Sequence, residues 1–202
     1  MLQQQVDNFC KALIKTGALK FGLFTLSGGK LGSYYLDLRI LPSFPDAFQT
    51  AIDLLAKKAK AITGIDKIAG IPTGGLPWAS VLAFSMSKPL VYTRKEAKLH
   101  GRERKVEGVL ASGDRVLLID DVITTGKNLL DGLQSLRGEG GVVEDALVLV
   151  DREEGGRTHL EKSGVKLHAV VQISEIARKL LDMDAITSSE YEEMVAQGKT
   201  GQ

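Results

Sequence analysis

Hydrophobic and polar positions follow a helical period near the start of the chain, interrupted by one strand-like stretch. One apolar face between residues 6 and 14 predicts a helix, with Gly17 as its stop. Residues 21–39 predict two short strands around a turn at 27–30. A second apolar stripe at 48–59 predicts another helix. The chain therefore begins with a helix, a hairpin and a helix.

From residue 67 onward, short apolar runs alternate with segments of helical period. The apolar runs predict strands at 67–71, 89–93, 115–119, 146–150 and 168–173. Helical segments fit between most of them, at 76–87, 127–138 and 156–163, and the tail from Ser174 is helical with a break near Asp184. Near-continuous apolar strands separated by helices are typical of a parallel sheet covered on both faces. The pattern predicts an α/β fold with a mostly parallel, five-stranded sheet.

Composition and charge narrow the classes of partner. The 202 residues carry a net charge of +1, which gives no general attraction to nucleic acid or to a membrane surface. Cys10 is the only cysteine, so an intrachain disulfide and a Cys-rich metal site are excluded. The first residues lack the pattern of a signal peptide, and no apolar run approaches the roughly 20 residues that span a bilayer. We expect a cytoplasmic protein.

Three of the predicted strands end in unusual sequences. The strand at 67–71 runs into Pro72-Thr73-Gly74-Gly75, the strand at 89–93 runs into a charged loop, and the strand at 115–119 runs into Asp120-Asp121. In open α/β sheets, ligands bind beyond the carboxyl ends of the strands. All three endings are therefore expected to face one cleft.

The acidic pair has several possible uses. Asp120 and Asp121 could bind a metal, act in acid–base chemistry, accept hydrogen bonds from sugar hydroxyls, or form a solvated turn that caps a helix. The next residues, 124–128, read TTGKN where a strand turns into a helix, and backbone N–H groups at such a turn bind phosphate. A phosphate cradle beside hydroxyl acceptors suits a ribose 5-phosphate. A Walker A pattern is excluded, because Asn128 follows Lys127.

Five stretches together resemble a known family. The sequence VLLIDDVITTG (116–126) resembles the signature of type I phosphoribosyltransferases, which bind 5-phosphoribosyl 1-pyrophosphate (PRPP). The stretch RKEAKLHG (94–101) resembles the catalytic loop of orotate phosphoribosyltransferases, and FGLFTLSGGKLGSYYLDLR (21–39) resembles their orotate-side hairpin. GIPTGGLPWAS (70–80) and LVLVDREEGG (147–156) are similar to their pyrophosphate-side and orotate-contacting segments. The later half particularly resembles the phosphoribosyltransferase half of bifunctional UMP synthases.

The resemblance implies roles for individual residues. The catalytic candidates are Arg94, Lys98, His100, Asp120 and Asp121, with Lys98 the most directly involved. The PRPP-binding candidates are Thr73, Gly74, Arg94, Lys95, Lys98, His100, Asp120, Asp121, Val122, Ile123, Thr124, Thr125, Gly126, Lys127 and Asn128. The orotate-binding candidates are Tyr35, Leu36, Thr124 and Arg152. His100 could donate a proton or only a hydrogen bond, and Arg152 could instead pair with Glu153 or Glu154.

The resemblance also implies an organisation and an activity. It implies one type I phosphoribosyltransferase domain over 1–202, with a hood at about 1–43, a PRPP-binding core at about 44–182 and a helical tail at 183–202. The implied reaction joins orotate to PRPP with Mg²⁺, which would be held by pyrophosphate, ribose hydroxyls and water and by no direct protein ligand. The implied partner is a second copy, whose active site the loop at 94–108 would reach. The chain could act alone or could dock with a separate orotidine 5′-monophosphate decarboxylase.

Two departures and two alternatives accompany this interpretation. Ser27 and Gly74 stand where many relatives have lysine, so Arg94, Lys95 and Lys98, or Mg²⁺, would carry more of the charge neutralisation. A purine or uracil phosphoribosyltransferase shares the PRPP motif, although the catalytic loop and the hairpin argue against it. A PRPP-sensing regulator would need a DNA-binding appendage, and the residues before the hairpin are too few for a helix-turn-helix domain.

Overall fold

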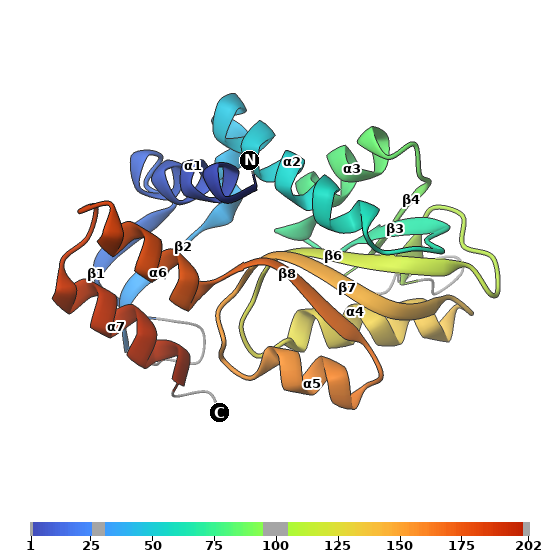
Figure 1. The fold of residues 1–202 in the computed structure, drawn as a ribbon. Coiled ribbons are helices and arrows are strands. Elements are labelled where there is room, and N and C mark those ends of the chain that lie inside the picture. Colours follow the sequence, from blue (N-terminus) through green and yellow to red (C-terminus); the bar gives the residue numbers. More distant parts are fainter. Residues whose placement is uncertain (1, 26–30, 95–104, 200–202) are drawn as a thin grey trace.

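The computed structural model describes residues 2–25, 31–94 and 105–199. A twisted sheet lies in the middle, with helices α2 (Pro45–Lys60) and α3 (Gly75–Ser85) on one face and α4 (Lys127–Gly138) and α5 (Gly156–Lys162) on the other (Figure 1). Helix α2 contacts β7 and β8, whereas α3 contacts β3, β4 and β6. This three-layer arrangement confirms the predicted α/β class.

The central sheet has the order β5-β4-β3-β6-β7-β8. Its five parallel strands are β4 (Leu90–Thr93), β3 (Lys67–Gly70), β6 (Arg115–Ile123), β7 (Val142–Asp151) and β8 (Lys166–Gln172). The sixth strand, β5 (Val106–Glu107), pairs antiparallel with β4 at the edge. The prediction of a loop over the whole of 94–108 was therefore wrong at this end, because these two residues complete a backbone ladder with Tyr92 and Thr93.

Strand β6 is longer than its apolar run. It continues through Asp120 and Asp121 to Ile123, with Asp120 opposite Val148 and Ile123 opposite Asp151. The acidic pair thus lies inside the last part of the strand and does not follow it. The parallel ladder with β7 holds these residues extended despite their charge.

A smaller layer covers one end of the sheet. It consists of α1 (Leu2–Lys15), the antiparallel pair β1 (Leu19–Thr25) and β2 (Leu31–Leu36), a 3₁₀ helix η1 (Leu38–Ser43), α6 (Ile173–Asp182) and α7 (Ser188–Lys199). In Figure 1 this layer stands beside the carboxyl ends of the strands. Asp184, at φ 53°, breaks the tail between α6 and α7 as predicted. The predicted turn at 27–30 lies outside the described residues.

One apolar cluster joins the small layer to the sheet. Phe9 and Leu13 from α1 belong to the same buried cluster as Trp78 from α3 and Leu147 from β7. Trp78 is fully buried and packs against Phe48, with the ring centroids 4.8 Å apart and the rings tilted by 59°. Removing this much apolar area from water is the main favourable term that holds the layer in place. Among the described helices, none has the length and apolar character to cross a bilayer.

Candidate active site

A cleft of about 640 Å³ opens where the small layer meets the carboxyl ends of β3, β6 and β7. Two walls face each other across it. Strand β2 and η1 form one wall, and the turn after β3, the end of β6 and the residues after β7 form the other. Its lining includes Tyr35, Leu36, Thr73, Gly74, Asp120, Asp121, Val122, Thr124, Thr125, Asn128 and Arg152. The structure thus brings together residues from all four described segments of the family resemblance.

The acidic pair is buried at the bottom of this cleft. Asp120 and Asp121 are 5% and 7% exposed. An oxygen of Asp120 accepts the backbone N–H of Asp121 at 2.9 Å, and an oxygen of Asp121 accepts the N–H of Val122 at 2.8 Å. Burial raises the pKa of both carboxyls, and the adjacent Asp121 raises that of Asp120 further. Such a pair favours a ligand that brings hydroxyl donors or a cation.

Two glycines let the turn after β3 approach the acidic pair. A Cβ on Gly74 would lie 2.7 Å and 2.8 Å from the two carboxylate oxygens of Asp121. A Cβ on Gly75 would lie 2.6 Å from the carbonyl oxygen of Ile119 and 3.0 Å from the Cα of Asp120. The close approach of Asp121 therefore explains why glycine stands at position 74, because a lysine there could fit only if Asp121 moved.

The residues after β6 form a turn into α4. Gly126 precedes the helix with a left-handed φ of 81°, which glycine adopts without steric cost. Gly126 and Lys127 line a hollow of about 240 Å³ that adjoins the cleft at Asp120. Backbone N–H groups at the start of α4, together with the positive end of the helix, suit a phosphate. Ile123 also lines this hollow, and its buried side chain belongs to an apolar cluster with Leu129 and Leu133 of α4.

Lys127 does not line the main cleft. Its amine bonds Asp131 at 2.9 Å, one turn along α4, and the side chain is largely exposed. A phosphate contact from Lys127 would therefore come from its backbone in the conformation seen here.

Arg152 and Tyr35 stand at the other end of the cleft. Arg152 is buried, with Nη2 2.7 Å from Oε1 of Glu154 and its guanidinium 5.0 Å above the ring of Tyr34. The pairing with Glu154 that was left open from sequence is present, and Arg152 lines the cleft at the same time. Tyr35 is half-buried and its ring lies 5.6 Å from that of Phe24. This end offers flat rings and one buried cation.

Asp37 and Arg39 also line the cleft, although neither was predicted from the sequence as a site residue. The guanidinium of Arg39 bonds both carboxylate oxygens of Asp37, at 2.6 Å and 2.8 Å, and the hydroxyl of Tyr35 at 2.8 Å. The hydrogen bond from Arg39 lowers the pKa of Asp37. The sequence did contain a signal for them, because the hairpin motif at 21–39 ends in D-L-R (37–39).

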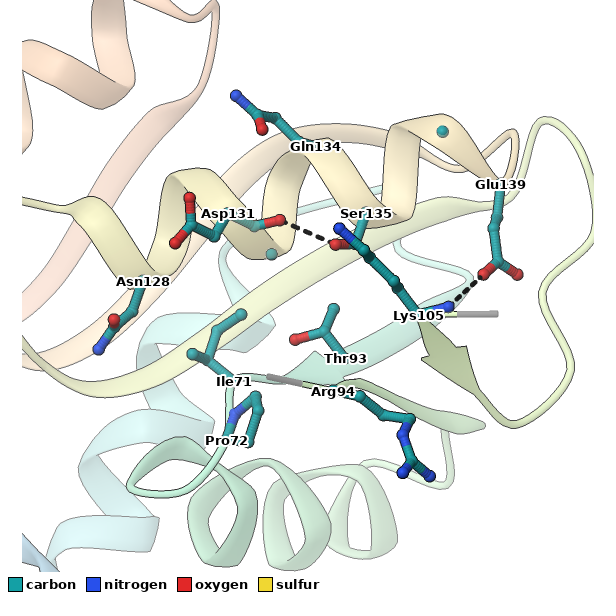
Figure 2. Close-up of a pocket in the computed structure, with 12 residues that line it drawn as sticks. Ile71, Pro72, Thr93, Arg94, Lys105, Asn128, Asp131, Gln134, Ser135 and Glu139 are labelled. Atoms are coloured by element: carbon teal, nitrogen blue, oxygen red, sulfur yellow. Dashed lines mark hydrogen bonds between the residues drawn. The ribbon is translucent and has the colours of Figure 1, made fainter. Parts of the chain in front are cut away.

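Arg94 lies next to a different cavity. This hollow of about 800 Å³, between the sheet edge and α4, meets the cleft at Pro72 and Asn128 (Figure 2). An Nη of Arg94 pairs with Glu107 at 2.9 Å, so the structure does not bring Arg94 to the acidic pair. Lys95, Lys98 and His100 lie outside the described residues, as does Ser27.

No group of three His, Cys, Asp or Glu side chains suited to a metal occurs within 2–25, 31–94 and 105–199. Among the carboxylates that line the cleft, Asp37 pairs with Arg39 and Glu154 pairs with Arg152, whereas Asp120 and Asp121 are adjacent in β6. One or two carboxylates completed by substrate phosphates and water are a usual environment for Mg²⁺. These residues therefore fit a magnesium ion that arrives with a phosphorylated ligand.

Comparison with known proteins extends over most of the chain. The Phosphoribosyl transferase domain family matches residues 43–178. An orotate phosphoribosyltransferase of Cenarchaeum symbiosum is 47% identical over 178 residues, covering 87% of this chain and 89% of the relative. One from Saccharolobus solfataricus is 44% identical over 183 residues, covering 91% and 92%.

Solved structures agree with these relatives. A UMP synthase of Leishmania donovani superposes with a TM-score of 0.87 and 34% identity, over 96% of this chain but 42% of the synthase. An orotate phosphoribosyltransferase of Aeropyrum pernix gives a TM-score of 0.75 and 39% identity, over 85% of this chain and 98% of that one. The resemblance to both kinds of protein is confirmed: this chain belongs to the orotate phosphoribosyltransferase family.

Proposed function

We propose that this protein transfers the 5-phosphoribosyl group from PRPP to orotate, giving orotidine 5′-monophosphate and pyrophosphate in pyrimidine synthesis. The observation that carries the proposal is the single cleft that joins the acidic pair and the phosphate-binding turn to Arg152 and Tyr35. The first two features suit a ribose 5-phosphate, and the last two suit a flat anionic base. Family membership supports the same reaction.

In the proposed complex each part of the cleft holds one part of the substrates. Asp120 and Asp121 accept the protons of the two ribose hydroxyls, and residues 124–128 bind the 5′-phosphate through backbone N–H groups. Thr73 and Gly74 face the pyrophosphate. Arg152, with Tyr35, Leu36 and Thr124 around it, binds the orotate carboxylate and ring, because a guanidinium matches a carboxylate in charge and shape.

The proposed reaction is a substitution at the anomeric carbon. Orotate N1 loses its proton to solvent and forms a bond to C1 of the ribose, while the bond from C1 to the pyrophosphate oxygen breaks and pyrophosphate leaves with the electron pair. The chain positions the two reactants and stabilises charge on the leaving group. Arg94, Lys95, Lys98 and His100 supply cations for that charge. Mg²⁺, when bound, neutralises pyrophosphate, while the acidic pair orients the ribose.

The proposal extends to assembly. A second copy of the chain would share each active site through the segment between β4 and β5, and an orotidine 5′-monophosphate decarboxylase would consume the product. The match to a UMP synthase supports the second partner. This chain covers 42% of the synthase, so that protein contains a further segment that this match does not include. We propose the cytoplasm as the location.

The test is loss of orotate absorbance in the presence of PRPP and Mg²⁺, with uracil, adenine and hypoxanthine as alternative acceptors. Turnover that requires orotate, PRPP and the metal is expected. Turnover with another base alone would mean that Arg152 and Tyr35 had been interpreted wrongly. Binding of PRPP without turnover of any base would favour a PRPP-sensing regulator.

A further inference from the structure

Helix α5 begins against the turn at 124–126, which joins β6 to α4. Two successive carbonyl groups of that turn are hydrogen-bonded to the helix. The N–H of Gly156 donates to the carbonyl oxygen of Thr124 at 2.9 Å. Nδ1 of His159 lies 2.9 Å from the carbonyl oxygen of Thr125. Because a carbonyl oxygen can only accept, Nδ1 is the donor in this second hydrogen bond.

The two backbones are in direct contact where the helix meets the turn. A Cβ on Gly126 would lie 3.2 Å from the carbonyl oxygen of Gly156 and 3.3 Å from its Cα. A Cβ on Gly156 would clash with the carbonyl oxygen of Thr124. Glycine at both positions therefore lets the start of α5 reach the turn with no side chain between them.

Helix α5 is itself fixed to the central sheet. The guanidinium of Arg157 bonds Oδ2 of Asp151 at 2.9 Å and 3.1 Å and the carbonyl oxygen of Leu167 at 2.8 Å, so it joins the helix to β7 and β8. Asp151 is buried, and Leu160 is buried in an apolar cluster shared by α4, α5 and the sheet. Hydrogen bonds between charged groups are stronger than those between neutral groups. The helix is thus a rigid support for the groups that hold the turn.

Holding a carbonyl group also sets the direction of the next N–H group. In a planar trans peptide unit the C=O and the N–H point in opposite directions. Because the carbonyls of Thr124 and Thr125 point to α5, the N–H groups of Thr125 and Gly126 point away from it. The hollow of about 240 Å³ beside the turn is lined by residues of β6, the turn and α4, so it opens on a side that α5 does not cover. The hydrogen bonds from α5 therefore orient two N–H groups toward the space proposed for the 5′-phosphate.

The place of His159 separates it from the residues that would touch a substrate. His159 is exposed on α5, and the residues that line the cleft and the hollow come from other elements. Its contact is with the carbonyl side of the turn, opposite to the N–H side. A solvent-exposed hydrogen bond contributes little to folding, so the effect of this one is expected in ligand binding.

We propose that His159 is a positioning residue, which holds the carbonyl of Thr125 so that the N–H of Gly126 faces the 5′-phosphate. This inference rests on the proposed function, because it takes the ligand of the turn to be a ribose 5-phosphate. A donor that is already oriented binds without the cost of ordering it, so losing the hydrogen bond weakens binding of the phosphate. The orotate end of the cleft is untouched.

The test compares three variants with the wild-type enzyme. His159→Ala removes the donor, His159→Asn places an amide N–H close to the position of Nδ1, and Thr158→Ala changes the exposed neighbour on the same helix. We expect His159→Ala to raise the KM for PRPP about threefold to tenfold, with kcat and the KM for orotate within about twofold of wild type. His159→Asn should restore the KM for PRPP to within about twofold, and Thr158→Ala should match wild type. Equal KM values for PRPP in His159→Ala and Thr158→Ala, or no rescue by asparagine, would overturn the proposal.

Binding of ribose 5-phosphate, measured by calorimetry, tests the same contact without turnover. Its dissociation constant is expected to rise in His159→Ala by the same factor as the KM for PRPP, because both ligands carry the 5′-phosphate. An unchanged constant would overturn the proposal, as would a wild-type protein that does not bind ribose 5-phosphate. A wild-type protein that binds ribose 5-phosphate but fails to turn over orotate would refute the proposed function, whereas the comparison of dissociation constants would still decide the role of His159.

Discussion

The acidic pair, at the end of the cleft proposed to bind the ribose and its phosphate (the phosphate end), is buried, whereas Arg39, at the end formed by β2 and η1 (the hairpin end), is exposed. At the phosphate end, Asp120 and Asp121 sit in a strand of the central sheet, and Gly75 lies against the backbone of that strand. At the hairpin end, Asp37 is the N-cap residue of the 3₁₀ helix that follows the two-stranded sheet, and it pairs with the 58% exposed Arg39 in that helix. At the phosphate end, close packing fixes the positions of the carboxylates. At the hairpin end, hydrogen bonds that are in contact with water fix the position of Arg39. The two ends should therefore respond differently to substitution.

The largest effect is expected for Gly75→Ala. The added Cβ would lie 2.6 Å from the carbonyl oxygen of Ile119 and 3.0 Å from the Cα of Asp120, and backbone cannot move aside as a side chain does. Overpacking of this kind costs about 1–3 kcal/mol, and here it also displaces the acidic pair. We expect a clear fall in Tm together with loss of PRPP binding, measured by thermal denaturation and by calorimetry.

Gly138→Ala is the matched control for that substitution. Gly138 lies in α4 with no atom within 4 Å of an added Cβ, and alanine is favoured over glycine in a helix by about 1 kcal/mol. The control should be neutral or slightly stabilising. If both variants lost the same stability, close packing at the phosphate end would not be the cause.

The second effect concerns the carboxylate that Gly74 accommodates. Asp121→Asn removes an acceptor for the ribose hydroxyls and should raise the KM for PRPP about tenfold or more, with a smaller rise for orotate. Gly74→Ala should act in the same direction at a smaller cost in stability than Gly75→Ala, because the three atoms nearest to its Cβ belong to the side chain of Asp121 and not to backbone. Separate Michaelis constants measure both. A larger rise for orotate would refute the assignment of Asp121 to the ribose.

The phosphate end was accessible from sequence because its residues are contiguous. The run from Asp120 to Asn128 contains carboxylates, hydroxyls and a turn glycine in one motif, and helix α4 begins and ends where its period predicts. The continuation of β6 through the acidic pair was missed, since it depends on the ladder with β7. Two further contacts were missed for the same reason, because their partners lie 13 and 34 residues apart. They are the pair of Arg94 with Glu107 and the hydrogen bond from the backbone N–H of Lys105 to Glu139. A contiguous motif reveals its chemistry in the sequence, whereas contacts between residues far apart in the sequence leave no such local pattern.

A third prediction uses the pKa of the buried pair. Burial and Asp121 raise the pKa of Asp120 in the folded state. A raised carboxyl pKa destabilises the folded state once the pH exceeds the unfolded-state value, and the penalty is complete above the folded-state value. Asp120→Asn should therefore raise the Tm of the ligand-free protein at pH 7, with the gain shrinking as the pH falls toward about 4.

Thermal scans between pH 4 and 8 measure this effect, with Asp53→Asn as the control. Asp53 lies on α2 and accepts a hydrogen bond from Gln49 at the surface. Its substitution should shift Tm little and without the same pH dependence. A gain in Asp120→Asn that is constant with pH would show that ionisation of the pair is not what destabilises the phosphate end.

The smallest effect is expected for Arg39→Ala at the hairpin end. The side chain of Arg39 is 58% exposed, and ion pairs of exposed arginines contribute about 0–1 kcal/mol, so the loss of stability should stay within about 1 kcal/mol. Arg178→Ala is the control, because Arg178 pairs with Asp182 on the surface of α6. Unlike Arg178, Arg39 lines the cleft, where its charge favours an anionic base, and it also donates to the hydroxyl of Tyr35. The KM for orotate should rise about twofold to threefold in Arg39→Ala and not in Arg178→Ala. A fall in Tm as large as that of Gly75→Ala would mean that the hairpin end depends on packing as strongly as the phosphate end does.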